Sequence, residues 1–249
     1  IDPDFAPAHS LLGGLSIWWD GNLATAAKHY LRALALGPSD PGILASATVL
    51  TRSLGRLEET IAFAEFVAAR DPLNAERYLD LAETYRLAGR LEDAIATYRI
   101  AQSLAPGGIL QPYTLGFAQL LKGDSQAALA SMEPAGEDVL RLAGSAMANH
   151  SLGRHPASDS ALAEMIVRGE KFAAYNVACV LAYRQESDRA FEWLNKALAN
   201  RDPGLKSEIV LEPLLASLHD DPRWLPFLRK IGRSPEQLAA VEFKVTLPR

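Results

Sequence analysis

The sequence predicts an all-α protein: a solenoid of about six helix pairs, with a C-terminal capping helix and an extended tail. Three observations carry this prediction. Alanine and leucine dominate the 249 residues while β-branched residues are sparse, which favours helices. Glycines recur 34 residues apart at Gly21, Gly55, Gly89 and Gly123. A fixed period of this length indicates stacked helix-turn-helix units, and a strand-like alternation marks only the C-terminal residues.

The clearest unit is "LAETYRLAGRLEDAIATYRIAQSLAP", residues 81–106. Gly89 lies between two helical patterns, and a glycine can adopt the positive φ that caps the first helix. Ala94 is small enough to let the two helices approach closely. Pro106 stops the second helix because it has no backbone N–H to continue the hydrogen-bond ladder. Gly89 therefore joins two helices and does not interrupt one.

This unit resembles the tetratricopeptide repeat. The match extends over residues 75–108, and the residues that carry it are Leu81, Ala82, Tyr85, Ala94, Tyr98, Ala101 and Pro106. Similar units cover residues 6–203. The resemblance implies a right-handed α-solenoid of antiparallel helix pairs that acts by binding, but it does not name a partner because the repeat serves many partners.

The copies follow one another along the chain, and four of them depart from the pattern, among them the fifth, whose second helix "RHPASDSALAEMIVRGE" we expect to be irregular. They span residues 6–40, 41–74 and 75–108, and then begin at Ile109, near Val139 and near Lys171. The first copy has an extra residue near "WWDG". Pro134 falls in the second helix of the fourth copy, so we expect that helix to be short or kinked. Gln185 replaces the turn glycine in the sixth copy.

Beyond the repeats, the sequence predicts a cap and a tail. We expect a repeat array over 1–203, capping helices over 204–233, and a short helix with an extended tail over 234–249. A solenoid needs such a cap to cover its last apolar face. In the tail "VEFKVTLPR", apolar residues alternate with polar neighbours. We therefore expect Phe243 and Val245 to be buried against the solenoid or against a partner.

The two ends also suggest a larger protein. The stretch from Ala190 to Gly232 is similar to the terminal repeat regions of bacterial multidomain signalling proteins, which often follow a cyclase, a kinase or a winged-helix domain. The opening "IDPDFAPAH" looks like the end of an earlier repeat, and the chain starts at Ile1 rather than Met. The expectation is a fragment or a processed product.

Composition narrows the function classes. The net charge of -5 and the pI of about 5.6 argue against nucleic-acid binding, which usually needs a basic face. The longest near-apolar run, "FAAYNVACVLAY", is too short to span a bilayer, so we expect no membrane insertion. Cys179 is the only cysteine, and no signal peptide is visible. We expect a cytoplasmic location, with the periplasm left open.

The sequence carries no constellation typical of catalysis. None of the five histidines belongs to an H-E-x-x-H motif, and neither a glycine-rich phosphate loop nor a G-x-S-x-G motif occurs. Cys179 lies in an apolar helix, where a buried, inert thiol is expected. We therefore predict a protein that is not an enzyme and that holds no cofactor or metal.

The resemblance also implies a binding surface, because the first helix of each tetratricopeptide repeat lines the concave face of the solenoid. Carried over by position, the groove residues are Arg52, Glu83, Arg86, Tyr113, Phe117, Met147 and Tyr175, with Tyr183 beside them. The basic residues are too scattered for the carboxylate clamp known in this family. The aromatic residues favour an apolar or extended peptide. That they are core residues stays an equal alternative.

Two readings of function follow. The first is a non-enzymatic scaffold that binds a protein or peptide partner in the groove. The alternative is a regulatory or oligomerisation segment of a larger bacterial signalling enzyme or transcription regulator, and a homo-oligomer is left open. Trp18 and Trp19 are a second candidate surface, because adjacent helical residues point about 100° apart and cannot both face the core.

Overall fold

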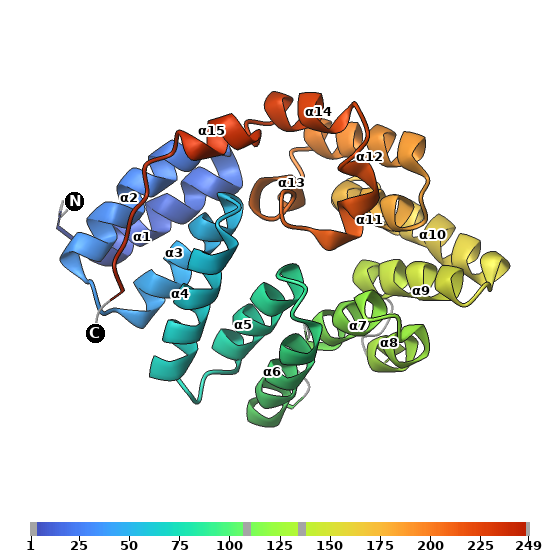
Figure 1. Ribbon diagram of the computed structural model, residues 1–249, viewed down its shortest axis with the longest axis horizontal. Helices are drawn as coiled ribbons and strands as arrows, with labels where there is room; N and C mark the ends of the chain where they lie inside the picture. The colour runs from blue at the N-terminus through green and yellow to red at the C-terminus, as the bar shows by residue number, and fades with distance from the viewer. Residues whose placement is uncertain (1–3, 107–110, 134–137, 248–249) are drawn as a thin grey trace.

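The computed structural model describes residues 4–106, 111–133 and 138–247. These residues form helices that pack in sequential pairs, with no strand among them, and build a curved solenoid (Figure 1). The six pairs are α1 (Ala6–Leu15) with α2 (Leu23–Leu36), α3 (Pro41–Ser53) with α4 (Leu57–Arg70), α5 (Ala75–Leu87) with α6 (Leu91–Leu104), α7 (Gln111–Leu121) with α8 (Ser125–Met132), α9 (Val139–Ser151) with α10 (His155–Gly169), and α11 (Ala174–Tyr183) with α12 (Ser187–Ala199).

The turn inside each pair confirms the repeat register. The backbone φ is positive at the corresponding residue of every copy: Gly21, Gly55, Gly89, Gly123, Gly153 and Gln185. At Gly89 the N–H of Arg90 reaches the carbonyl of Tyr85 at 2.9 Å, and the N–H of Gly89 reaches Arg86 at 3.0 Å. This is the hydrogen-bond pattern of a Schellman cap, which ends one helix and redirects the chain into the next.

The irregular copies have physical explanations. Residues Ser16–Asp20 form a π-helix, η1, which absorbs the extra residue expected near "WWDG". Helix α8 has only 8 residues, so the expected short helix is confirmed, although Pro134 itself lies outside the described residues. In the sixth copy Gln185 takes φ 63°, which shows that the fold imposes the left-handed turn even without glycine.

The C-terminal residues turn back into the solenoid. Short helices α13 (Gly204–Ser207) and η3 (Pro213–Leu218) lie inside the curve formed by α3, α5, α7, α9 and α11 (Figure 1). Three of their side chains, Leu205, Leu215 and Leu218, are at most 4% exposed and belong to the core of the later repeats. Helix α14 (Trp224–Lys230) follows on the outside. The division of the chain at residue 203 stays a prediction, because these segments share their core with the repeats.

The same segment joins the two ends of the solenoid. The Lys206 ammonium donates to the backbone carbonyls of Trp18 and Trp19, both at 2.8 Å. The Arg233 guanidinium donates to the carbonyl of Gly21 at 3.2 Å and to that of Lys206 at 3.0 Å. Because Arg233 is almost completely buried, these contacts fix the C-terminal segment to the first repeat.

The tail confirms the predicted alternation. After α15 (Pro235–Ala239), residues 242–247 are extended and run back beside α2 (Figure 1). Phe243 is 1% exposed and packs with Val245 into the core of the first two repeats, whereas Lys244 is exposed. The Arg56 guanidinium donates to the carbonyls of Val241 and Phe243. The tail therefore docks on its own chain.

Candidate binding site on the concave face

Six of the eight predicted groove residues line one cavity of about 350 Å³ on the concave face. They are Glu83, Arg86, Tyr113, Phe117, Met147 and Tyr175, from the inner helices α5, α7, α9 and α11. The cavity is partly open and falls at the lower end of the usual size of ligand sites. The family positions therefore gather at one place, even though they are spread over four repeats.

The other two predicted residues lie elsewhere. Arg52 forms an ion pair with Glu208, described below, and does not itself line the cavity. The hydroxyl of Tyr183 lies 2.7 Å from that of Ser151, away from the cavity.

Most of the predicted groove side chains are deeply buried. Met147 is 0% exposed, Tyr113 is 3% and Tyr175 is 5%, so each is also a core residue. Phe117 and Glu83 are half-buried and form the accessible part of the lining. The burial agrees with the core alternative for Tyr113, Met147 and Tyr175, which also border the cavity; their use as a binding groove stays a prediction.

Sequence reasoning missed the part of the cavity lining that the C-terminal segment provides. Glu208, Glu212 and Leu214 close the cavity from the side opposite the inner helices. The signal that could have revealed them is the "EIVLE" pattern at 208–212, in which two carboxylates lie four residues apart just beyond the repeats. The Glu212 N–H donates to the Glu208 carbonyl at 3.0 Å, so a helical turn brings the two side chains to one side.

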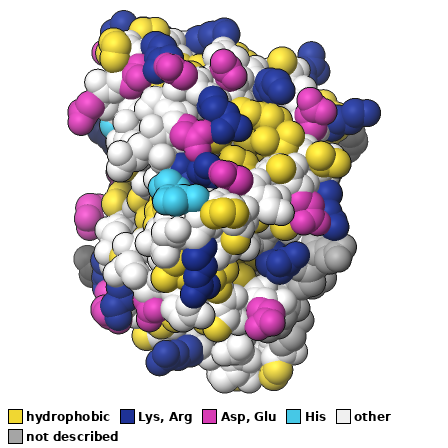
Figure 2. Space-filling view, turned by 90° about the vertical axis from the view of Figure 1, so that its right-hand side faces the viewer, with side chains coloured by type: hydrophobic (Ala, Val, Ile, Leu, Met, Phe, Trp, Pro, Cys, Tyr) yellow, Lys and Arg dark blue, Asp and Glu magenta, His cyan; other side chains and the backbone are white. Residues whose placement is uncertain are grey.

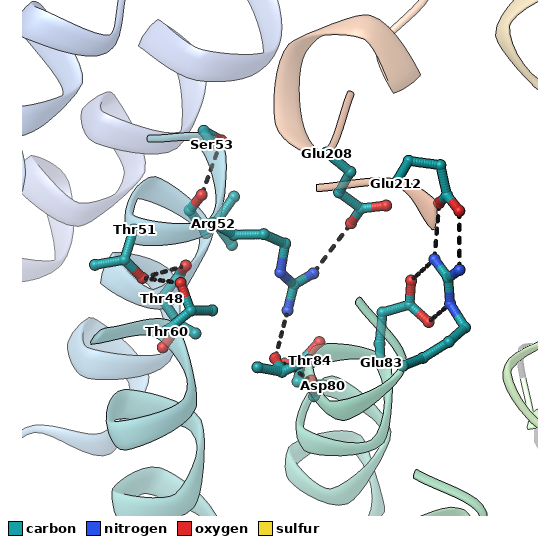
Figure 3. Close-up of polar contacts among 12 residues, drawn as sticks. Thr48, Thr51, Arg52, Ser53, Thr60, Asp80, Glu83, Thr84, Glu208 and Glu212 are labelled. Carbon is teal, nitrogen blue, oxygen red and sulfur yellow. Dashed lines mark hydrogen bonds and ion pairs between the residues drawn. The ribbon is translucent and has the colours of Figure 1, made fainter. Parts of the chain in front are cut away.

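Those two carboxylates bind the two arginines of the predicted groove (Figure 3). Arg52 and Arg86 occupy the same position in successive repeats, 34 residues apart. The Arg52 Nη1 lies 3.1 Å from Glu208 Oε1, and its Nη2 donates to the Thr84 hydroxyl at 3.3 Å. The Arg86 guanidinium donates to both oxygens of Glu212, at 3.0 and 2.8 Å.

Arg86 is held from two sides. Its Nε and Nη2 also donate to the two carboxylate oxygens of Glu83. Burial on its own lowers the pKa of Arg86, but Glu212 and Glu83 more than offset it and raise that pKa well above its usual value. In turn, burial raises the pKa of Glu83, and the stronger effect of Arg86 lowers it. Arg86 and the two carboxylates form one ion-pair triad, in which the guanidinium pairs with Glu83 and Glu212 at the same time.

The single cysteine borders the cavity. Cys179 is 4% exposed, and burial raises the pKa of its thiol well above the ordinary value, with the charge of Glu212 adding to the effect. A protonated, buried thiol is a poor nucleophile. The expected burial of this thiol is confirmed, and its lack of reactivity stays a prediction.

Other features singled out in the sequence lie away from the cavity. The rings of His150 and His155 meet edge to face, with centroids 5.5 Å apart and an angle of 66° between their planes. Trp19 is 78% exposed and Trp18 is 42% exposed, so neither is a core residue. Figure 2 shows one side of the molecule, where basic and acidic side chains are interspersed and do not separate into large patches of one sign. No helix within the described ranges combines the length and the apolar character needed to cross a bilayer.

The helix pairs, the left-handed turns and the concave inner face together define the fold of the tetratricopeptide-repeat proteins. Among solved structures, TTC0263, a thermophilic tetratricopeptide-repeat protein of Thermus thermophilus, aligns with a TM-score of 0.61 and 21% identity, covering 75% of this chain and 99% of its own. A tetratricopeptide repeat protein of Parabacteroides merdae aligns over 95% of this chain and 97% of its own, with a TM-score of 0.54 and 15% identity.

A chain of the APC/C hetero-tetramer Cut9–Hcn1 is similar over 88% of this chain and 44% of its own, with a TM-score of 0.62 and 17% identity. No family model matches the sequence, and no curated protein matches it significantly. The likeness is therefore one of fold.

Proposed function

We propose that this chain is a non-enzymatic scaffold that binds a protein or peptide partner through the concave face of its solenoid. The observation that carries the proposal is the cavity that four successive inner helices line with residues at the family's groove positions. Aromatic side chains on a rigid wall give a large contact area at a low cost in conformational entropy. A similar chain in the Cut9–Hcn1 hetero-tetramer shows that this fold is used in protein assembly there. A cytoplasmic location remains part of this proposal.

Within the groove, Phe117 is the residue we expect to contribute most to binding. It lines the cavity and is only half-buried, so truncating it removes contact area without opening a fully buried core. For a peptide selected from a random library on the immobilised protein, we expect Phe117→Ala to weaken binding by about tenfold or more, as for an aromatic hot spot. Isothermal titration calorimetry measures the change.

The matched control for this prediction is Phe172→Ala. Phe172 is 63% exposed and does not line the cavity, so its removal should change the affinity by less than about twofold. If the two variants bind the selected peptide equally well, the partner does not use the cavity. If only Phe172→Ala loses affinity, the contact surface lies on another part of the solenoid.

A second candidate function is an oligomerisation or regulatory segment of a larger signalling protein, and one observation favours it. The helices of the first repeat expose Leu11 at 65%, Leu15 at 45% and Trp19 at 78%, more apolar surface than isolated residues usually present. If this surface joins two copies, Leu11→Glu should shift the sedimentation equilibrium from dimer to monomer at micromolar concentration. A wild-type protein that sediments as a monomer at about 100 µM would remove this candidate.

A further inference from the structure

The chain's own C-terminal segment adds carboxylates to the concave face beside the cavity. On the inner helices, the Arg86 guanidinium lies beside the Glu83 carboxylate and Arg52 lies beside Asp80, so positive and negative groups balance there. The segment adds Glu208 and Glu212, which form a cluster of three carboxylates with Glu83. One oxygen from each carboxylate lies within 4.8 Å of the others. The C-terminal segment therefore makes this part of the concave face more acidic than the repeats alone would make it.

Glu208 is the least compensated of the three carboxylates. Arg86 binds both oxygens of Glu83 and both oxygens of Glu212, whereas Glu208 has one ion pair, with Arg52 at 3.1 Å. Burial raises the pKa of Glu208 even against the opposing charge of Arg52. A raised carboxylate pKa means that its surroundings supply too little positive charge. A cation placed in the cavity would supply that charge.

A second group in the cavity also lacks a partner. Tyr175 is 5% exposed, lines the cavity, and has a buried hydroxyl beside the Cys179 thiol. Among the described residues this hydroxyl has no hydrogen-bond partner of good geometry. An unsatisfied buried hydroxyl costs free energy, which a ligand with N–H groups could recover by donating to its oxygen.

The remaining walls suit an alkyl chain that ends in a charge. Tyr113, Phe117, Leu140, Met147 and Leu214 form the apolar lining, and aromatic rings also attract cations through their faces. A hydrated divalent metal ion fits less well, because Arg86 already binds both oxygens of Glu83 and of Glu212 and leaves too few free carboxylate oxygens to coordinate the ion. A primary alkylammonium matches both the charge and the walls.

We propose that this cavity binds the ammonium group of a lysine side chain on the partner, held by Glu208 and the Tyr175 hydroxyl with its alkyl stem against the apolar wall. The proposal rests on the proposed function of the concave face and names the chemistry of its partner. A free alkylamine carries the same group, so the test includes one probe of each source.

The test uses n-butylammonium and a capped lysine tripeptide as probes, with n-butanol as a neutral analogue of nearly equal size. Methyl NMR of the full chain follows the ε-methyl of Met147, which lines the cavity, against that of Met165, which is fully buried outside it. We expect both cationic probes to shift the Met147 signal saturably and to bind about tenfold more tightly than n-butanol, with the Met165 signal unmoved. Tighter binding of the tripeptide than of the amine would assign the site to a peptide partner.

A charge-neutralising variant sharpens the result. Glu208→Gln should weaken n-butylammonium about tenfold and leave n-butanol unchanged, whereas Glu92→Gln, an exposed carboxylate on α6, should change neither. Equal binding of n-butanol and n-butylammonium in the wild-type chain would overturn the charge proposal and leave the groove intact. If no probe shifts Met147, the cavity admits no ligand, and the proposed groove fails there as well. A calcium-induced shift at lower concentration than the amine would overturn the proposal in favour of a metal site.

Discussion

Replacing Arg86 by alanine is expected to lower the free energy of unfolding by about 3–5 kcal/mol, one of the two largest effects of any substitution considered. Arg86 is 3% exposed, and its guanidinium binds Glu83 and Glu212 at the same time. Without it, the buried carboxylate of Glu212 and the half-buried carboxylate of Glu83 lose their partner and must ionise without compensation or take up protons. The loss also frees the C-terminal segment at Glu212, so the midpoint of urea denaturation should fall strongly.

The control is an ion pair of similar length on the surface. Lys122 lies 2.6 Å from Glu92, with both side chains largely exposed. Lys122→Ala should therefore cost no more than about 1 kcal/mol, because water solvates the carboxylate that remains. Similar small losses for the two variants would show that the Arg86 triad contributes little to stability. An unchanged midpoint for Arg86→Ala would mean that the C-terminal segment is not anchored at Glu212.

Local chemistry was enough to predict the repeats. A positive φ at the turn needs glycine or a strong tertiary constraint, and the 34-residue spacing of glycines marked those turns directly. Gln185 shows that the position of a residue within the repeat can predict a turn even where the residue is not glycine. Its position, rather than its side chain, predicts a turn, and its φ of 63° agrees. The alternation in the tail likewise predicted which face of residues 241–247 is buried.

The closure of the site could not be predicted in the same way. Arg52 pairs with a carboxylate 156 residues away, and Arg86 with one 126 residues away. A repeat period describes how neighbours stack, but it does not say where a non-repeating segment will return. The repeat positions on the inner helices therefore predicted the cavity lining that these helices provide. Glu208 and Glu212, which set the charge of the cavity, could be identified only from the structure.

Replacing Phe243 by alanine is expected to destabilise the first two repeats by about 3–5 kcal/mol, as for a large side chain removed from a packed core. Phe243 is 1% exposed and packs in the core shared by α2, α3 and α4. Its loss also weakens the Val241 and Phe243 backbone contacts with Arg56, because these depend on the docked tail. Amide hydrogen exchange should accelerate in α3 and α4, while α9 and α10 keep their protection, since repeats are stabilised mainly by their neighbours.

Lys244→Ala provides the matched control for the tail. Lys244 is the next residue, is exposed, and points away from the core, so its removal should leave exchange in α3 and α4 unchanged. If Phe243→Ala also leaves this exchange unchanged, the tail does not support the first repeats. If Phe243→Ala instead accelerates exchange in every repeat, the solenoid unfolds as one unit. The contacts of the C-terminal segment with Trp18 and Gly21 would then couple the first repeat to the last. The expected acceleration of exchange in α3 and α4 alone would show that the tail stabilises the first two repeats locally. This contact lies outside the cavity that the partner is proposed to use.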